Sequence, residues 1–285
     1  MRLGGERESR NVEDRRGGGG IGIVGGGIGT IVLVVLGLLF GIDPSVILSG
    51  VGGGEPQQPR VQAPSVTQSP GAQGQPDEMR QFVARVLATT EDVWSGVFQA
   101  NGRQYDPPRL VLFSGGVQSA CGAASTAVGP FYCPADKQVY LDLAFFRDMD
   151  RQLGAPGDFA QAYVIAHEVG HHVQNEMGIM RRADALRAGA SEAEGRAISV
   201  RVELQADCFA GLWANRANQA RGILERGDLE EGLNAAAAVG DDRLQRRSQG
   251  QVVPESFTHG SSAQRVRWFR RGLESGDVRQ CDTFD

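Results

Sequence analysis

One stretch of the sequence constrains the fold and the chemistry of this chain more than any other. It runs from Tyr163 to Gln174 and reads Tyr-Val-Ile-Ala-His-Glu-Val-Gly-His-His-Val-Gln. On a helix, His167 and His171 lie one turn apart on the same face, so that both imidazoles can bind one metal ion. Glu168, the residue after the first histidine, then reaches a water molecule on that ion. The stretch predicts a buried helix that carries a zinc site.

A catalytic zinc site takes three ligands from the protein and leaves a fourth position for water. The third ligand is offered by Glu203-Leu204-Gln205-Ala206-Asp207. On a helix Glu203 and Asp207 share a face, so we expect Glu203 to bind the metal and Asp207 to accept the spare ring N–H of a ligand histidine. The sequence therefore predicts Zn2+ as the cofactor, held by His167, His171 and Glu203.

Two further histidines lie near these motifs or follow them. His172 is turned about 100° round the helix from His171, which favours packing over metal binding. His259 has three interpretations that the sequence leaves open: a donor to the oxyanion that forms during hydrolysis, a fourth ligand in a latent site, or a structural histidine. We carry His259 forward with Glu168 as a candidate catalytic residue.

Several segments together resemble one known family. They are Cys121-Gly122, Gly129-Pro130-Phe131-Tyr132-Cys133-Pro134, Val139-Tyr140-Leu141-Asp142, the motif helix, Glu203 to Asp207, and Phe257-Thr258-His259-Gly260-Ser261-Ser262. Through these segments the chain resembles the bacterial putative neutral zinc metallopeptidase family. The resemblance extends from the N-terminal glycines of the chain to its C-terminal Cys-Asp-Thr-Phe. The resemblance implies a membrane-anchored zincin, but it implies no particular substrate.

The N-terminal quarter of the chain predicts a membrane anchor. Residues 1–20 begin with a very polar stretch and are expected to be disordered. Residues 21–42 carry no charge and are long enough for one transmembrane helix. Residues 43–76 are rich in Gly, Pro and Gln, which is typical of a flexible linker. The folded domain is expected over residues 77–285.

The charges beside the apolar stretch predict its orientation. Arg15 and Arg16 precede it and Asp43 follows it, which by the positive-inside rule leaves the N-terminus in the bacterial cytoplasm and the domain in the periplasm. A cleaved signal peptide is the alternative, although no Ala-x-Ala-like site follows Ile42.

For residues 77–285 we expect an α+β fold that is mostly helical, zincin-like, with a small β-sheet. Strands are predicted at Arg109–Phe113 and Gln138–Leu143. The second has two interpretations that stay open: a strand that holds extended substrate by main-chain pairing, or an ordinary core strand. Capping boxes at Ser191 and Ser261 predict helix starts, and a further helix is expected from Leu229 to about Arg246.

The four cysteines suit disulfides in a domain outside the cytoplasm. We expect Cys121 to pair with Cys133, which is close in sequence, and Cys208 to pair with Cys281. A second metal site is the competing interpretation, but no Cys-x-x-Cys spacing supports it.

Composition narrows the function further. The formal net charge of -5 and the lack of a basic stripe argue against nucleic acid as the main partner. The motifs predict a peptidase in which Glu168 is the general base and a peptide or protein is the substrate. Two alternatives remain: a catalytically silent zinc- and peptide-binding scaffold of the cell envelope, and a zinc hydrolase of a cell-wall amide.

Overall fold

The structure is a computed structural model that describes residues 1–16 and 77–285. The expected anchor at residues 21–42 and the linker at residues 43–76 lie outside the described residues. Within the part of the chain that the structure describes, no helix combines the length and the apolar character needed to cross a membrane.

A small mixed sheet forms one layer of the domain. Its strand order is β1 (Val12–Asp14), β2 (Arg109–Phe113), β6 (Gln138–Asp142) and β5 (Phe131–Cys133). β1, β2 and β6 run parallel, and β5 is antiparallel to β6. Both predicted strands are present. However, β6 lies between β2 and β5, so the edge strands are β1 and β5. The stretch that was a candidate for pairing with substrate is therefore an interior strand of the core.

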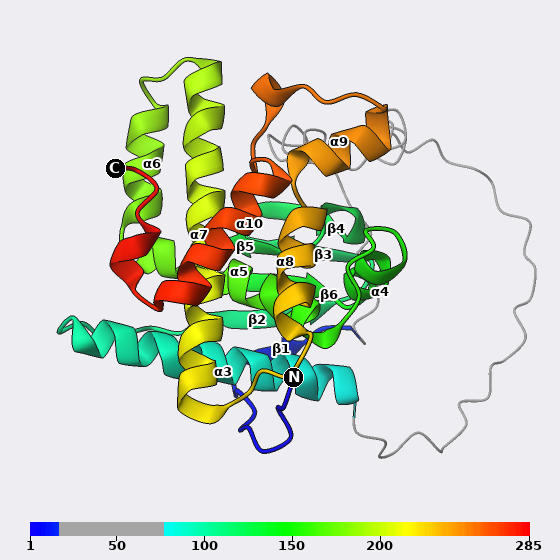
Figure 1. Ribbon diagram of the computed structural model, residues 1–285, viewed down its shortest axis with the longest axis vertical. Helices are drawn as coiled ribbons and strands as arrows, with labels where there is room; N and C mark the ends of the chain where they lie inside the picture. The colour runs from blue at the N-terminus through cyan, green and yellow to red at the C-terminus, as the bar shows by residue number, and fades with distance from the viewer. Residues whose placement is uncertain (17–76) are drawn as a thin grey trace, which may run out of the picture.

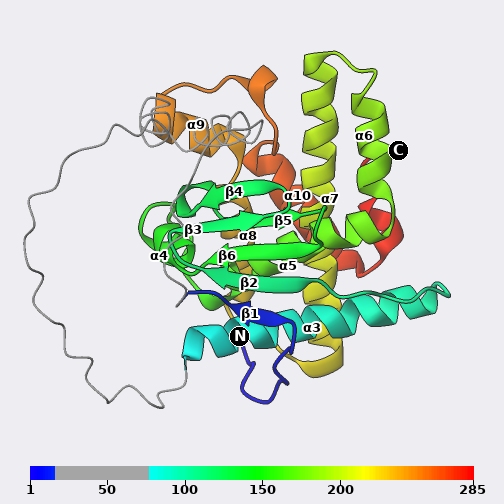
Figure 2. The ribbon, with the colours of Figure 1, turned by 180° about the vertical axis from the view of Figure 1, so that it is seen from behind.

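Helices cover one face of this sheet (Figure 1), and the view from behind shows the strands in front of them (Figure 2). The alternation along β2 explains the two faces, because Leu110 and Leu112 join the main core whereas Val111 and Phe113 join a small second cluster. Val117 of a separate hairpin, β3 (Gly116–Ser119) and β4 (Gly122–Ser125), packs against that second cluster.

The main core lies among α3 (Glu78–Ala100), α5 (Asp158–Glu176), α7 (Glu192–Arg221), α8 (Asp228–Ala238) and α10 (Ser262–Ser275). α7 and α10 pack most closely, because a Cβ on Gly211 would overlap Phe269 and one on Gly272 would overlap Cys208. The shorter helices are α4 (Ala144–Arg151), α6 (Ile179–Arg187) and α9 (Asp241–Gln249).

Two of the three expectations about helix ends are confirmed. Ser191 and Ser261 each form a complete capping box at the start of α7 and α10. The expected helix from Leu229 to about Arg246 is wrong, since the chain turns between α8 and α9. Gly240 lies in this turn against Ser262, where a Cβ would have no room.

The expectation that the N-terminal segment is disordered is wrong for residues 1–16. β1 pairs with β2 in the register Val12↔Leu110, and Leu3 is buried in the main core. The carboxylate of Glu91 accepts hydrogen bonds from three residues of the segment, namely Arg7, Ser9 and Asn11. The polar residues that suggest disorder are thus paired with partners distant in the sequence.

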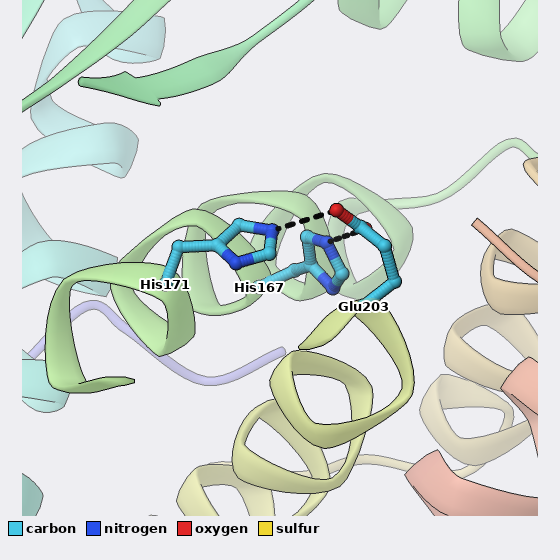
Figure 3. Close-up of side chains that lie close together, drawn as sticks. All are labelled: His167, His171 and Glu203. Carbon is cyan, nitrogen blue, oxygen red and sulfur yellow. Dashed lines mark hydrogen bonds and ion pairs between the residues drawn. The ribbon is translucent and has the colours of Figure 1, made fainter. Parts of the chain in front are cut away.

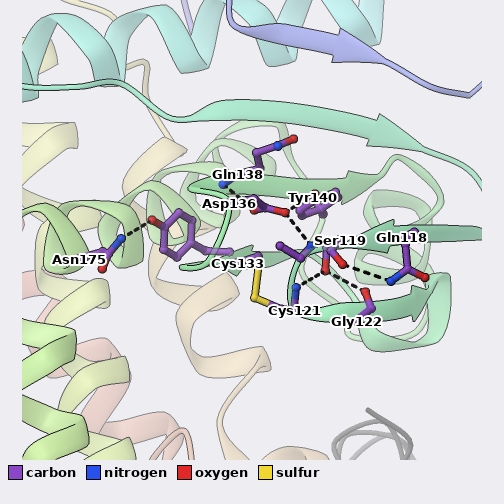
Figure 4. Close-up of a disulfide and its surroundings, with 11 residues drawn as sticks. Gln118, Ser119, Cys121, Gly122, Cys133, Asp136, Gln138, Tyr140 and Asn175 are labelled. Carbon is purple, nitrogen blue, oxygen red and sulfur yellow. Dashed lines mark hydrogen bonds between the residues drawn. A yellow bond between two sulfur atoms is a disulfide. The ribbon is translucent and has the colours of Figure 1, made fainter. Parts of the chain in front are cut away.

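Both predicted disulfides are present, Cys121–Cys133 and Cys208–Cys281. The first joins the β3–β4 hairpin to β5 (Figure 4). The second joins α7, which carries Glu203, to the C-terminal segment. Each disulfide therefore fixes an element that lines the candidate site.

Candidate metal centre

The three predicted metal ligands come together (Figure 3). His167 and His171 project from α5, and Glu203 reaches them from α7. The Nε2 atom of His167 lies 3.2 Å from Oε2 of Glu203, and Nε2 of His171 lies 3.4 Å from Oε1 of the same carboxylate. One ligand atom from each residue lies within 4.8 Å of those of the other two, an arrangement that can hold a metal ion.

Gly170 allows this approach of the two helices. A Cβ at this position would lie 3.1 Å from the carbonyl oxygen of Ala206 and 3.2 Å from its Cα, closer than most side chains tolerate. Because Gly170 has no side chain, α7 can come close enough to α5 for Glu203 to reach both imidazoles.

The donor set and the charge of the centre fit zinc. Two imidazole nitrogens and one carboxylate form a usual catalytic zinc set with an open fourth position. Glu203 and Asp207 bring two carboxylates to the centre, and the guanidinium of Arg265 pairs with Asp207. A divalent cation held by neutral His167 and His171 would balance the remaining negative charge of Glu203.

Asp207 lies behind His167 as the sequence predicts. Its Oδ1 atom is 2.9 Å from Nδ1 of His167, so Nε2 is directed toward Glu203. The hydroxyl of Tyr163 donates a hydrogen bond to the same carboxylate. Burial alone would raise the pKa of Asp207, but the charge of Arg265 and the hydrogen bond from His167 outweigh burial and hold that pKa below its ordinary value. Asp207 is therefore an anionic acceptor that fixes the orientation of His167.

Arg265 is a site residue that the sequence interpretation missed. Its side chain is only 4% exposed, and it donates from Nε and Nη2 to the two oxygens of Asp207 and from Nη1 to the carbonyl of Val239. A signal was present, because Arg265 falls on the apolar stripe that continues through Phe269 and Leu273. A charged residue on the buried face of an amphipathic helix requires a buried partner.

Gln174, the last residue of the stretch from Tyr163 to Gln174, is a second site residue that the sequence interpretation missed. Its side-chain oxygen lies 2.9 Å from Nδ1 of His171, and its amide donates to the carbonyl of Val202 on α7. Gln174 thus orients His171 as Asp207 orients His167.

His172 is fully buried between Tyr132 and the carbonyl of Asp106, away from the ligand set, in agreement with its predicted packing role.

His259 lines the same cavity as the three ligands and Glu168. Its Nδ1 atom lies 3.1 Å from Oδ1 of Asp241, which leaves Nε2 as the ring nitrogen available to the cavity. Oδ2 of Asp241 accepts backbone N–H groups from Thr258, His259 and Gly260. Burial alone would lower the pKa of His259, but the hydrogen bond to Asp241 and the charge of Glu203 raise it. The Gly240-Asp241-Asp242 turn thus holds this histidine at the site.

A helix that carries His-Glu-x-x-His, joined by a carboxylate from a later helix, defines the zincin class of metal centre. The sequence matches the family described as "Putative neutral zinc metallopeptidase" over residues 1–284. The chain belongs to this family.

Two relatives share much of the sequence. "Uncharacterized protein YpfJ" of Escherichia coli (strain K12) is 49% identical over 294 residues, which cover 100% of this chain and 99% of that protein. "Uncharacterized protein Rv2575" of Mycobacterium tuberculosis (strain H37Rv) is 43% identical over 261 residues, which cover 87% of this chain and 84% of that protein. No solved structure matches the chain.

Proposed function

We propose that this protein is a zinc-dependent peptidase whose zinc ligands are His167, His171 and Glu203. The observation that supports this most is their convergence in one cavity with Glu168. A site that only binds metal has no need of a carboxylate beside the open position, whereas hydrolysis needs a base there.

Zinc bound to these three residues would lower the pKa of a bound water toward about 7 and polarise the carbonyl of the substrate. Glu168 accepts the proton of the attacking water and later delivers it to the leaving amine. Asp207 and Gln174 keep the two histidines in the tautomer that directs Nε2 to the metal. Although burial alone would lower the pKa of His259, Asp241 raises it and so favours the imidazolium form, which donates from Nε2 to the oxygen of the carbonyl as negative charge develops on it.

We also propose that the domain lies outside the cytoplasmic membrane and is attached to it through residues 21–42. The two disulfides support the first point, since disulfides persist in oxidising compartments. The pairing of β1 with β2 adds a condition, because it requires residues 1–16 to share a compartment with the domain. A single crossing by residues 21–42 would place residues 1–16 on the other side of the membrane and break this pairing. Protection of the β1 amides from hydrogen exchange in the membrane-bound protein would therefore contradict a single-pass anchor and leave only attachment without a crossing.

Turnover tests the proposed activity. The full chain and its Glu168→Gln variant, both loaded with zinc, are incubated with casein. We expect cleavage by the wild-type chain and at least a hundredfold slower cleavage by the variant, with equal zinc content in both. Equal cleavage by both would remove Glu168 from the role of base. Zinc in both without cleavage by either would favour a scaffold or a non-peptide substrate.

A further inference from the structure

The cavity that contains the metal ligands has a volume of about 260 Å3, and part of its lining is apolar. Beside the polar residues already described, half-buried or buried apolar side chains form what we call the apolar wall. These are Val128, Phe131, Phe145, Val164, Val239 and Leu244.

Two aromatic rings of this wall are held in place by their neighbours. Phe131 of β5 stacks on Tyr140 of β6, with ring centroids 4.8 Å apart and planes inclined by 10°. Phe145 of α4 packs against Gly129, where a Cβ would lie 3.5 Å from the ring. Gly129 has a φ of 78°, a conformation that favours glycine. The aromatic part of the wall is therefore preformed.

The remaining side chains connect the wall to the catalytic residues. Val164 lies on α5 one turn before Glu168, and Leu244 lies on α9, the helix that begins at Asp241. A substrate group that contacts these side chains must lie beside the bond that Glu168 and His259 act on.

We infer that this wall is a specificity subsite for a large apolar side chain of a peptide substrate, in a residue that flanks the scissile bond. The charged residues that line the cavity are those already assigned to the metal centre, so a charged substrate side chain against the apolar wall would lose its hydration without gaining a partner. A sugar hydroxyl would lose its hydrogen bonds there in the same way. An aliphatic or aromatic side chain instead gains free energy from burial.

The inference rests on the proposed peptidase activity and names its substrate class, which disfavours a cell-wall amide. Its test uses peptides of one sequence that differ only in the residues beside one bond, with Leu, Phe, Gly, Asp or Lys at either position. For the zinc-loaded full chain we expect kcat/KM for Leu and Phe to exceed that for Asp and Lys by about tenfold or more.

Two variants test whether this wall sets the preference. We expect Leu244→Asp and Phe145→Ala to reduce the preference for apolar residues by about tenfold. The matched control is Leu186→Asp, because Leu186 is 47% exposed on α6, outside the cavity. It should leave the preference unchanged. Cleavage that ignores both flanking residues, or a preference that survives in both wall variants, would overturn the inference.

Binding separates this inference from the peptidase proposal. The Glu168→Gln chain is titrated with the same peptides, and we expect tighter binding of the Leu and Phe peptides than of the Asp and Lys peptides. If the wild-type chain cuts no peptide but this order of affinity holds, the peptidase proposal fails and the apolar subsite stands. If the affinities do not depend on these residues, the subsite assignment fails.

Discussion

Arg265 forms a two-point ion pair with Asp207, at 2.8 Å from Nε to Oδ2 and 2.9 Å from Nη2 to Oδ1. Both side chains are buried, and Asp207 also accepts from the imidazole of His167. Loss of one partner from a buried pair leaves an uncompensated charge. The pair thus links the stability of the domain to the orientation of a metal ligand.

Substitution of Arg265 should therefore affect both properties. We expect Arg265→Met to lower the free energy of unfolding by about 3–5 kcal/mol, measured by urea denaturation. Arg265→Lys keeps the charge but loses the two-point geometry, so zinc affinity should fall by roughly 10–100-fold in a chelator competition. The control is Arg267→Met, an exposed position on the same helix. A fully stable Arg265→Met variant with unchanged zinc affinity would contradict this role.

The close approach at Gly170 gives a second prediction. A methyl group in Gly170→Ala would push α5 away from Ala206 and move Glu203 from the histidines. We expect weaker zinc binding and a loss of about 1–3 kcal/mol of stability. Gly96→Ala on α3 is the matched control, because a Cβ there meets no neighbour, and it should stabilise the chain by about 0.5–1 kcal/mol. Equal effects at both sites would show that the helices are not in tight contact.

The pair of Asp241 and His259 predicts a pH dependence of stability. Burial alone would raise the pKa of Asp241, but the imidazole and the backbone N–H groups lower it, whereas the pKa of His259 is raised. The contribution of His259 is complete below its unfolded pKa, about 6.5, and is lost as pH rises through the higher folded pKa. The contribution of Asp241 is present above its unfolded pKa, about 3.9, and is lost as pH falls through its lower folded pKa.

The Asp241→Asn substitution removes the negative charge from the pair of Asp241 and His259. We expect the variant to lose more unfolding free energy at pH 6, where both partners are charged, than at pH 9.5, where the imidazole of His259 is closer to neutral. Urea denaturation at the two pH values measures the difference. The control is Asp242→Asn, at the neighbouring position of α9. A penalty for Asp241→Asn that is the same at both pH values would show that the ion pair does not contribute.

The contacts of Glu91 predict how residues 1–16 are held. Glu91→Ala removes the carboxylate that accepts from Arg7, Ser9 and Asn11. We expect hydrogen exchange in β1 to become at least tenfold faster, while exchange in α5 changes little. Glu78→Ala, an exposed substitution on the same helix, should change neither. Unprotected β1 amides in the wild-type chain would contradict the strand pairing. Residues 1–16 could then lie on the opposite side of the membrane from the domain.

The sequence was most informative where a local pattern sets the geometry. Spacing along the chain predicts three features: His167 and His171 on one helical face, the capping boxes at Ser191 and Ser261, and the disulfide between Cys121 and Cys133, which are 12 positions apart. Glu203 and Asp207 were also predicted, because their helical spacing matches two distinct needs of a zinc site.

The features that were missed depend on contacts between distant segments. Arg265 reaches Asp207 across 58 positions, and Asp241, at the start of α9, reaches His259 across 18 positions. The N-terminal segment was expected to be disordered because its composition is polar, and its partner Glu91 is 80 or more positions away. The periodicity of a helix can indicate that a buried charge such as Arg265 needs a partner, but it does not identify the distant residue that supplies it.

The most direct test of the account is the zinc content of the purified full chain, measured by elemental analysis beside His167→Ala and Glu203→Ala variants. The control is His172→Asn, since His172 lies outside the ligand set and its two polar contacts suit an amide. We predict one zinc per wild-type chain and per His172→Asn chain, and little zinc in the other two variants. No zinc in the wild-type chain, or undiminished zinc in both His167→Ala and Glu203→Ala, would contradict the central claim.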